Sequence, residues 1–315
     1  MLAVLTAAVF STATHTDTTF VARSGARLEI NNFGGDIAVE TWTRNAVRVE
    51  ADHGARVGVV VDADAGVVEV RATTRLGVPT TVDFRLTVPR GMSLKLTTIH
   101  GDIDVKGVEG DVEASSVQGD VSVGGPARSV KAGSVEGDAS VSGARGKVEV
   151  SSVNADASAE HVAGPISISS VNGDVTLSAV ESDDVEASTI NGEVRYEGAI
   201  RDRGSYRFSS HDGGITVAIP DRAGAAVSVS TFSGGFSSAF PIPWSGARRS
   251  NQFSFTLGNG GARIELESFQ GEIRLQRPGT GKDRMKERDA EKSKAKHRAK
   301  THDDGDDESD EGNRP

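Results

Sequence analysis

Apolar and polar residues alternate along the middle of the chain, in short runs that end at Gly-Asp pairs. In SSVNGDVTLSAV (169–180), one polar residue separates Val175 from Leu177, and SSVQGDVSVGG (115–125) has almost the same pattern. Alternation with period two is typical of β-strands, and glycine and aspartate favour turns. The pattern therefore predicts many short strands, each followed by a turn.

The strands recur at a fixed spacing. From Ile99, ten consecutive nine-residue units keep register without an insertion, and the register slips by one after Ser188. Looser copies follow near SSHDGGITVAIP, STFSGGFSSAF and SFQGEIRL. A stricter period of eighteen residues overlies the first and produces two columns of identical residues. They are Asp102, Asp120, Asp138, Asp156 and Asp174, and Ser116, Ser134, Ser152, Ser170 and Ser188.

Two folds could use this repeat. An antiparallel meander would place tight hairpin turns at the Asn-Gly pairs 172–173 and 191–192, whereas a parallel β-solenoid would use two units per coil. In a meander, residues eighteen apart lie on strands that are not neighbours, so nothing would keep the serines identical. In a solenoid they stack about 4.8 Å apart and can hydrogen-bond to one another as a ladder. We therefore expect an all-β chain built on a parallel β-solenoid (β-helix) with 18-residue coils.

The distribution of aromatic residues predicts how the solenoid ends. No aromatic occurs from Gly91 to Arg195, where valine, alanine and serine fill the inward positions of a thin core. Aromatics gather before and after the repeats, and a solenoid must cover its terminal coils or it pairs edge to edge with other copies. We expect a strand-rich N-terminal cap at 14–90, regular repeats at 91–197, and irregular coils with an aromatic-rich C-terminal cap at 198–277.

Both ends of the chain differ from the repeats. The run LAVLTAAVF is too short to span a bilayer, but it matches the apolar region of a secretory signal at 1–13, with a small-x-small cleavage site after Ala13. A basic region before it is missing, and the alternative is an ordinary buried strand. The segment 278–315 carries blocks of opposite charge and almost no apolar residues, which predicts a disordered charged tail.

Composition restricts the chemistry that the chain can perform. The sequence has no cysteine, which excludes disulfides and thiolate sites, and its formal net charge of -10 argues against a nucleic-acid partner. No later segment is long and apolar enough for a transmembrane segment. The seven histidines follow no metal-ligand spacing: His15, His53, His100, His161, His211, His297 and His302.

The aspartate and serine columns are the remaining candidates for chemistry. Calcium-binding nonapeptide solenoids require the spacing GGxGxD, whereas glycine and aspartate are adjacent here, so we interpret the aspartates as turn formers. The serines have no histidine or aspartate in register, and buried mutual hydrogen bonds explain them better than a nucleophile does. We therefore predict no catalytic, cofactor-binding or metal-ligating residues, and no cofactor.

Three features together resemble the bacterial DUF4097 family of β-strand-repeat proteins, which are also labelled "putative adhesins". They are DTTFVARSGARLEINNFGGDIAVETW, VDFRLTVPRGMSLKLTTIHGDIDV and the tandem GDV units, and the resemblance covers 17–277. It implies an exported β-solenoid without established catalysis. No catalytic motif is available to transfer.

The expected function is that of a non-catalytic, exported scaffold of the periplasm, outer envelope or cell surface. It would bind a glycan or protein partner on a solenoid face, in an adhesin-like manner. One alternative is a self-assembling structural module like the bactofilins, which polymerise through their ends. Another is a polysaccharide-acting β-helix enzyme, but the outward positions of the repeats show no pair of acids or basic cluster that such an enzyme needs.

Overall fold

The computed structural model describes residues 5–9, 14–22, 25–55, 57–64, 66–74, 80–242 and 251–279. Within these ranges every regular element is a β-strand. The chain divides into two units, Met1–Gln276 and Arg277–Pro315, and all the strands belong to the first. The predicted tail lies outside the described residues except for its first two positions, and its disorder stays a prediction.

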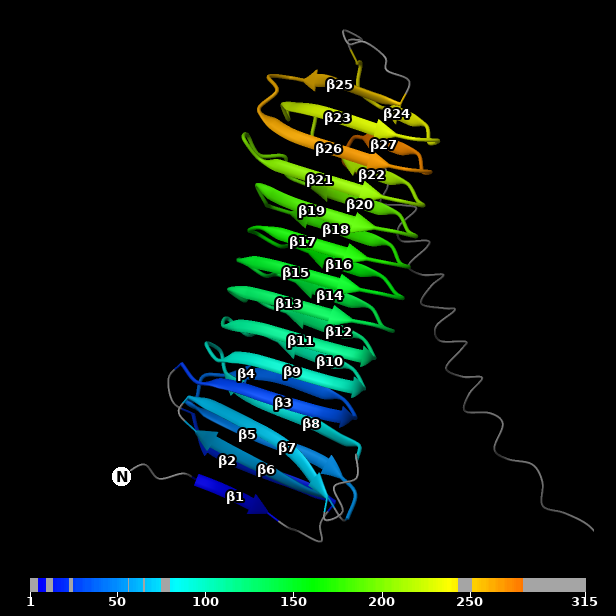
Figure 1. The fold of residues 1–315 in the computed structure, drawn as a ribbon. Coiled ribbons are helices and arrows are strands. Elements are labelled where there is room, and N and C mark those ends of the chain that lie inside the picture. Colours follow the sequence, from blue (N-terminus) through cyan, green and yellow to red (C-terminus); the bar gives the residue numbers. More distant parts are fainter. Residues whose placement is uncertain are drawn as a thin grey trace, which may run out of the picture. The chain divides into compact units, whose positions relative to one another are not determined.

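Two sheets, called sheet A and sheet B below, build the first unit (Figure 1). In spatial order, sheet A consists of β1 (Leu5–Val9), β6 (Val57–Asp64), β7 (Val67–Thr74), β3 (Arg27–Gly34), β9 (Ser93–His100), β11 (Asp111–Gln118), β13 (Ser129–Ser134), β15 (Lys147–Ser152), β17 (Ile166–Ser170), β19 (Asp184–Thr189), β21 (Ser205–Ser210), β26 (Ala262–Ser268), β23 (Ala225–Thr231) and β25 (Gln252–Leu257). Sheet B consists of β2 (His15–Val21), β5 (Ala46–His53), β8 (Val82–Pro89), β4 (Ile37–Trp42), β10 (Ile103–Lys106), β12 (Val121–Gly124), β14 (Ala139–Ser142), β16 (Ala157–Glu160), β18 (Val175–Val180), β20 (Val194–Gly198), β22 (Ile215–Ala218), β27 (Ile273–Gln276) and β24 (Phe236–Ser238).

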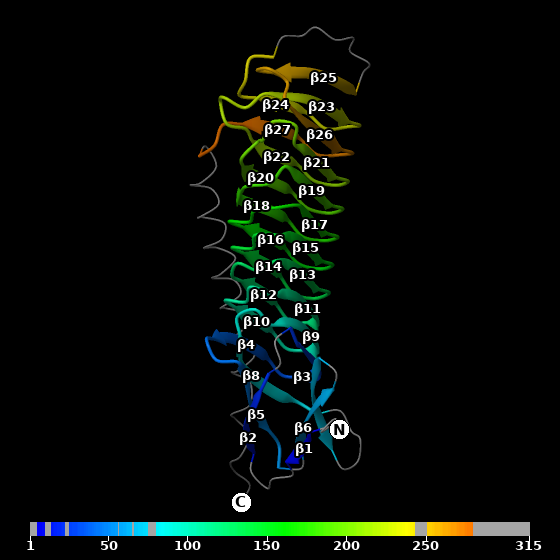
Figure 2. The ribbon, with the colours of Figure 1, turned by 90° about the vertical axis from the view of Figure 1, so that its left-hand side faces the viewer.

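The predicted parallel solenoid is confirmed. Successive strands of the repeats alternate between the two sheets, and each pairs in parallel with the strand one coil away (Figure 2). Val121 pairs with Ile103 on one side and with Ala139 on the other, which is the eighteen-residue register. The hairpins of a meander would instead have paired consecutive strands antiparallel.

The register slip occurs earlier than predicted. Ala163 bridges Glu181, eighteen residues on, whereas Ile166 pairs with Val185, nineteen residues on. The extra residue therefore lies in the turn between Glu181 and Val185, where buried Ser182 accepts the backbone N–H of Asp184. Strand β19 is consequently displaced by one position relative to the period expected from the sequence.

A thin core fills the space between the sheets. In the repeats it consists of small side chains from both sheets, such as Val112 and Ala114 from β11 and Val121 and Val123 from β12, all nearly inaccessible to solvent. Aromatic side chains enter the core at the C-terminal end, where Tyr196 contacts both Tyr206 and Phe208 edge-on or tilted. The aromatic-rich C-terminal cap is therefore present.

The caps do not follow chain order. At the C-terminal end, β26 lies between β21 and β23, and β27 lies between β22 and β24, although β26 and β27 are the last strands of the chain. At the N-terminal end, β3 lies between β7 and β9, and β4 lies between β8 and β10. Each cap therefore holds one interleaved coil, with a neighbour on either side that is distant along the chain.

The first strand bears on the predicted export signal. Leu5–Val9 is strand β1, which pairs antiparallel with β6 at the edge of sheet A. This arrangement corresponds to the alternative of an ordinary strand that the sequence left open. The boundaries of the segments, the signal at 1–13 included, stay predictions.

Close approach of neighbouring coils explains the glycine at most Gly-Asp turns. A Cβ atom on Gly137 would lie 2.1 Å from the carbonyl oxygen of Gly119, and one on Gly119 would lie 2.1 Å from that of Gly101. Gly119 also has a φ of +147°, which favours glycine, whereas Gly137 does not have a positive φ. Stacking of the turns is therefore a more general reason for the glycine than the backbone conformation predicted from the sequence.

Candidate functional site

The inward serines close one corner of each coil. The hydroxyl of Ser116 donates to the carbonyl of Gly101 at 2.9 Å, and Ser134 repeats this contact with Gly119 at 2.7 Å. These serines are buried, as predicted. They do not bond to one another, and each hydroxyl instead donates to a backbone carbonyl of the preceding coil. The prediction that the serine hydroxyls bond to one another is therefore wrong, because their partners are backbone carbonyls.

Ser188 does not belong to this column. The extra residue before β19 shifts Ser188 to the outward face, where it pairs with Ser169. Thr189 takes the inward place and donates to the carbonyl of Gly173 at 2.8 Å. A threonine hydroxyl can replace a serine hydroxyl there because both present one O–H donor from Cβ.

The aspartate column forms a ladder of side-chain to backbone bonds. Oδ1 of Asp102 accepts the backbone N–H of Asp120 at 2.7 Å, and Oδ1 of Asp120 accepts that of Asp138 at 2.9 Å. Asp138 and Asp156 continue the series, with N···O distances of 3.1 and 2.8 Å. Each carboxylate therefore bonds the turn of the next coil. This contact is a charge-assisted bond that accounts for the aspartates without a cation.

The other predicted candidates form no reactive group. Among the described residues, no three His, Cys, Asp or Glu side chains lie close enough to hold a metal ion. His100 and His161 are exposed, and His53 is buried with its Nε2 2.8 Å from the hydroxyl of Thr16. His297 and His302 lie outside the described residues.

An apolar ridge follows the inward serines. The residue directly after each inward Ser, Thr or Asn points outward at the corner, and along sheet A these residues form one line. Of the ten large apolar side chains exposed in the described part of the chain, eight belong to this ridge. They are Phe33, Ile99, Val117, Val135, Val153, Ile190, Phe269 and Phe232.

Three rings stack at the C-terminal end of the ridge. The ring of Phe269 lies parallel to the ring of His211, with centroids 4.8 Å apart, and parallel to the ring of Phe232, with centroids 4.6 Å apart. We call these three residues the aromatic stack. It exists because β26 lies between β21 and β23, which places Phe269 between two residues that precede it in the chain.

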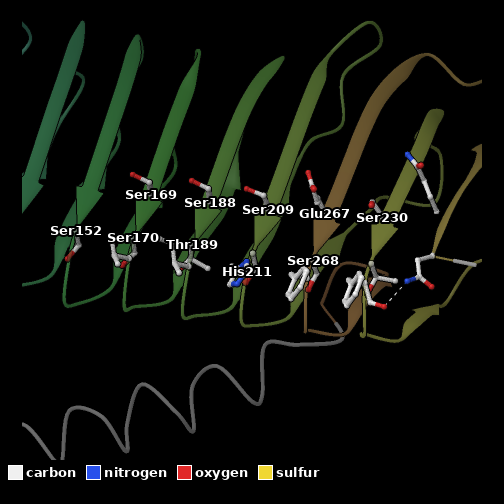
Figure 3. A pocket seen from close by; sticks show the side chains of 18 residues that line it. Ser152, Ser169, Ser170, Ser188, Thr189, Ser209, His211, Ser230, Glu267 and Ser268 are labelled. Atoms are coloured by element: carbon white, nitrogen blue, oxygen red, sulfur yellow. Dashed lines mark hydrogen bonds between the residues drawn. The ribbon is translucent and has the colours of Figure 1, made fainter.

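An outward row of polar side chains runs beside the ridge. Ser169, Ser188 and Ser209 pair in register on successive strands, and the row continues through Glu267 and Ser230 to Gln252 (Figure 3). We call these six residues the hydroxyl row. Within the part of the chain that the structure describes, the hydroxyls of the four serines have no hydrogen-bond partner, and no cation pairs with Glu267.

The hydroxyl row, the inward corner residues and the ridge enclose a groove of about 790 Å³. It crosses the strands of sheet A from β15 to β25. Its lining is Ser152, Ser169, Ser170, Val171, Ser188, Thr189, Ile190, Ser209, Ser210, His211, Ser230, Thr231, Phe232, Asn251, Gln252, Glu267, Ser268 and Phe269. We call it the C-terminal groove. Among the residues that the structure describes, the lining contains no lysine or arginine and only one carboxylate, that of Glu267.

The rest of the outward face of sheet A differs in charge. Glu186, Arg207 and Glu265 lie in one column on adjacent strands, each two residues before a member of the hydroxyl row. Nε of Arg207 donates to Glu265 at 3.1 Å. This hydrogen bond raises the pKa of the Arg207 guanidinium above its ordinary value. In the same column the Lys147 ammonium beside Glu149 lowers the pKa of that carboxyl. The C-terminal groove is thus an almost uncharged surface next to a charged column.

The sequence contains a signal for this site in the residues that form the ridge. In each repeat the residue after the inward Ser or Thr is apolar or aromatic: SSVQGD and SSVNGD in the regular coils become SSHDGG, ESFQGE and STFSGG towards the C-terminus. The change from valine to rings predicts an aromatic end to the ridge. Which rings touch depends on the interleaved coil, which the sequence order does not reveal.

Comparison with known proteins gives a family match and remote structural likenesses. The family model described as Toastrack DUF4097 matches residues 16–198 and 140–276. A crystal structure of a "putative cell adhesion protein" from Clostridium sporogenes aligns with 84% of this chain and 99% of its own, at 10% identity and a TM-score of 0.26. One of a "putative adhesin" from Bacteroides fragilis aligns with 83% of this chain and 96% of its own, at 10% identity and a TM-score of 0.35.

No curated protein matches the chain. The described residues include no helix long and apolar enough to cross a membrane. The family match covers β2 to β27, which are the strands that build both sheets apart from β1.

Proposed function

The chain belongs to the Toastrack DUF4097 family, and from that premise we propose that it is a non-catalytic, exported scaffold of the bacterial envelope or surface that binds a partner at the C-terminal groove. The partner is a glycan or a protein. The observation that carries this proposal is the groove itself, where half-buried hydroxyls without protein partners face stacked rings. Grooves of mixed apolar and polar lining are typical of ligand sites.

The arrangement of charged groups supports binding rather than catalysis. Glu267 is the single carboxylate among the described lining residues, and general acid–base chemistry on a glycosidic bond uses two. His211 stacks on Phe269, and no serine of the lining bonds to it. A base within hydrogen-bond reach of its nucleophile is what nucleophilic catalysis requires.

The ends of the solenoid do not favour the alternative of a filament. A filament of stacked coils would continue the parallel pairing of the repeats across its ends. At the C-terminal end, β25 instead pairs antiparallel with β23, and β24 at the edge of sheet B has only three residues. Short or irregular edge strands reduce pairing between copies.

Binding of the full-length chain to purified bacterial cell envelopes tests the proposal. Ser188→Arg places a long cationic side chain in the groove, whereas Ser115→Arg makes the same change at the corresponding outward position four coils away, outside the groove. We expect co-sedimentation of the wild type and Ser115→Arg with the envelopes and a loss for Ser188→Arg. Equal sedimentation of all three proteins, or none for the wild type, would contradict a partner site at the groove.

A further inference from the structure

We propose that the ligand of the C-terminal groove is a single strand of an uncharged polysaccharide, which lies across the strands of sheet A between the hydroxyl row and the aromatic stack. This inference rests on the proposed function and specifies its ligand. It is carried by four properties of the groove: its length and repeat, its lack of charge, its unbonded hydroxyls and its rings.

The groove repeats a hydrogen-bonding group at every strand. The hydroxyl row has one residue on each of six adjacent strands, so it extends over about 24 Å with a spacing of about 4.8 Å. A linear polymer with hydroxyl groups along its length can contact several of these positions at once. A small isolated ligand would use only one or two of them.

A peptide fits this direction less well. A peptide that binds by strand addition runs parallel to the strands and uses a free sheet edge. The C-terminal groove instead crosses the strands from β15 to β23, each of which already pairs with a strand on both sides, and reaches the edge of the sheet only at β25. The backbone at the ridge is also bonded, because the carbonyl of Val153 accepts the N–H of Asn172 and that of Ile190 accepts the N–H of Asp212.

The charge of the groove selects an uncharged chain. Recognition of uronate, sulfate or phosphate groups uses arginine or lysine, and neither occurs among the described residues that line the groove. The exposed carboxylate of Glu267 would repel an anionic polymer. Towards a neutral sugar, the same carboxylate acts as an acceptor for a hydroxyl group.

The unbonded hydroxyls need partners that a sugar supplies. Ser169, Ser188, Ser209 and Ser230 are half-buried. By contrast, the inward hydroxyls of Ser170, Thr189, Ser210 and Ser268 each donate to a backbone carbonyl. A serine hydroxyl can donate one bond and accept two, and so can each sugar hydroxyl. The serines of the hydroxyl row can therefore replace hydrogen bonds to water by hydrogen bonds to ligand hydroxyls, without a change in the protein structure.

The aromatic stack supplies the apolar side of the groove. Phe232 is 65% exposed, which is unusual for a phenylalanine and leaves apolar surface for a ligand. A pyranose ring has an apolar C–H face as well as a polar rim. A sugar between the stack and the hydroxyl row can bury its C–H groups against the rings while its hydroxyls face the serines.

Calorimetric titration of the full-length chain tests the inference. The probes are neutral hexasaccharides (cellohexaose, xylohexaose, mannohexaose and N-acetyl-chitohexaose) and two acidic ones, hexagalacturonate and a heparin hexasaccharide. We expect at least one neutral probe to bind and neither acidic probe to do so. Phe232→Ala and Ser188→Arg should each weaken that binding by about tenfold or more.

Matched controls separate a local effect from a folding defect. Phe33→Ala removes the ring at the opposite end of the ridge, which is 43% exposed, and Ser115→Arg changes the hydroxyl row's column outside the groove. Both should bind the neutral probe within about twofold of the wild type. Equal weakening by the controls, or binding of acidic probes alone, would overturn the inference.

Competition on cell envelopes distinguishes this inference from the proposed function. Displacement of the wild-type protein by the neutral hexasaccharide supports both. Groove-dependent envelope binding that no neutral probe displaces overturns the polysaccharide but leaves a partner site, as for a protein ligand. Absence of groove-dependent binding in both assays overturns both.

Discussion

At the scale of single residues, the corner of each coil depends on one hydroxyl. Ser152 is 3% exposed, donates to the carbonyl of Gly137 at 3.0 Å and accepts the N–H of Ala155 at 3.2 Å. It therefore satisfies two backbone groups of two different coils. Glu149, three residues earlier, is outward and pairs with Lys147 at 2.5 Å near solvent.

Ser152→Val should destabilise the protein far more than Glu149→Val. Loss of the hydroxyl leaves a buried carbonyl and a partly buried N–H without this partner, and an unsatisfied buried group costs about 1–3 kcal/mol. Loss of a surface ion pair costs at most about 1 kcal/mol. Urea unfolding of both variants measures the difference, and equal midpoints would contradict the role of the corner hydroxyl.

The two tyrosines of the chain predict its behaviour in base. Tyr196 and Tyr206 are buried, and burial raises the pKa of both phenols above the ordinary value. A folded pKa above the unfolded one leaves stability unchanged below about pH 10 and lowers it as pH rises further. The absorbance of phenolate should therefore appear only together with unfolding.

Tyr206→Phe provides the control for that titration. In the wild type, the Tyr206 hydroxyl donates to the carbonyl of Ser182 at 2.7 Å and accepts the N–H of Arg201 at 2.8 Å. The free energy of unfolding of the variant should therefore be lower by about 1–3 kcal/mol at neutral pH. The fall of its unfolding free energy above pH 10 should also be shallower. Phenolate formation in the folded wild type at an ordinary pKa would refute the prediction.

At the scale of elements, β26 connects strands that would otherwise be separate. It pairs in parallel with β21 on one side and with β23 on the other. Leu266 on this strand is 1% exposed. Strands β23 and β25 thus depend on a strand that follows them in the chain.

Leu266→Ala should loosen the C-terminal cap selectively. Deletion of a buried leucine side chain costs about 2–5 kcal/mol. Because β23 and β25 reach the rest of sheet A through β26, their amide protons should lose protection from hydrogen exchange, while those of β11 and β13 keep it. A uniform loss of protection along sheet A, or none in β23 and β25, would contradict this dependence.

At the scale of the whole molecule, the ladder of aspartates predicts independence from calcium. The carboxylates already accept backbone N–H groups, and the coils are held by backbone ladders and a core of small apolar residues. A calcium-dependent solenoid gains much of its folding free energy from the ion. Thermal unfolding of the full chain in EDTA and in millimolar calcium should give midpoints within about 10 °C.

The sequence predicts the solenoid well because its period is a direct consequence of stacking. Residues eighteen apart become neighbours, so the sequence alone predicts the columns that contain Asp102 and Ser116. The period does not predict the hydrogen-bond partner of each hydroxyl. The partner of Ser116 is the carbonyl of Gly101 and not another serine. The period also does not reveal the displaced register of Ser188, which arises from one extra residue in an irregular turn.

The candidate site was less predictable for a topological reason. His211, Phe232 and Phe269 are scattered in the sequence and meet only because β26 enters between two earlier strands. The C-terminal copies follow one another along the sequence, and nothing in them indicates that the last copy lies between two earlier ones in space. The hydroxyl row ends in Glu267, Ser230 and Gln252 for the same reason.

The interleaved coil also sets an order of events during synthesis. A solenoid can add coils as the chain leaves the ribosome, because each coil needs only the one before it. The strands β23 to β25 break that sequence, since their neighbour β26 is translated after them. The C-terminal cap can close only when Gln276 has emerged, and Phe269 completes the aromatic stack in the same step. The groove therefore needs these late strands, and a chain that ends before Phe269 lacks it.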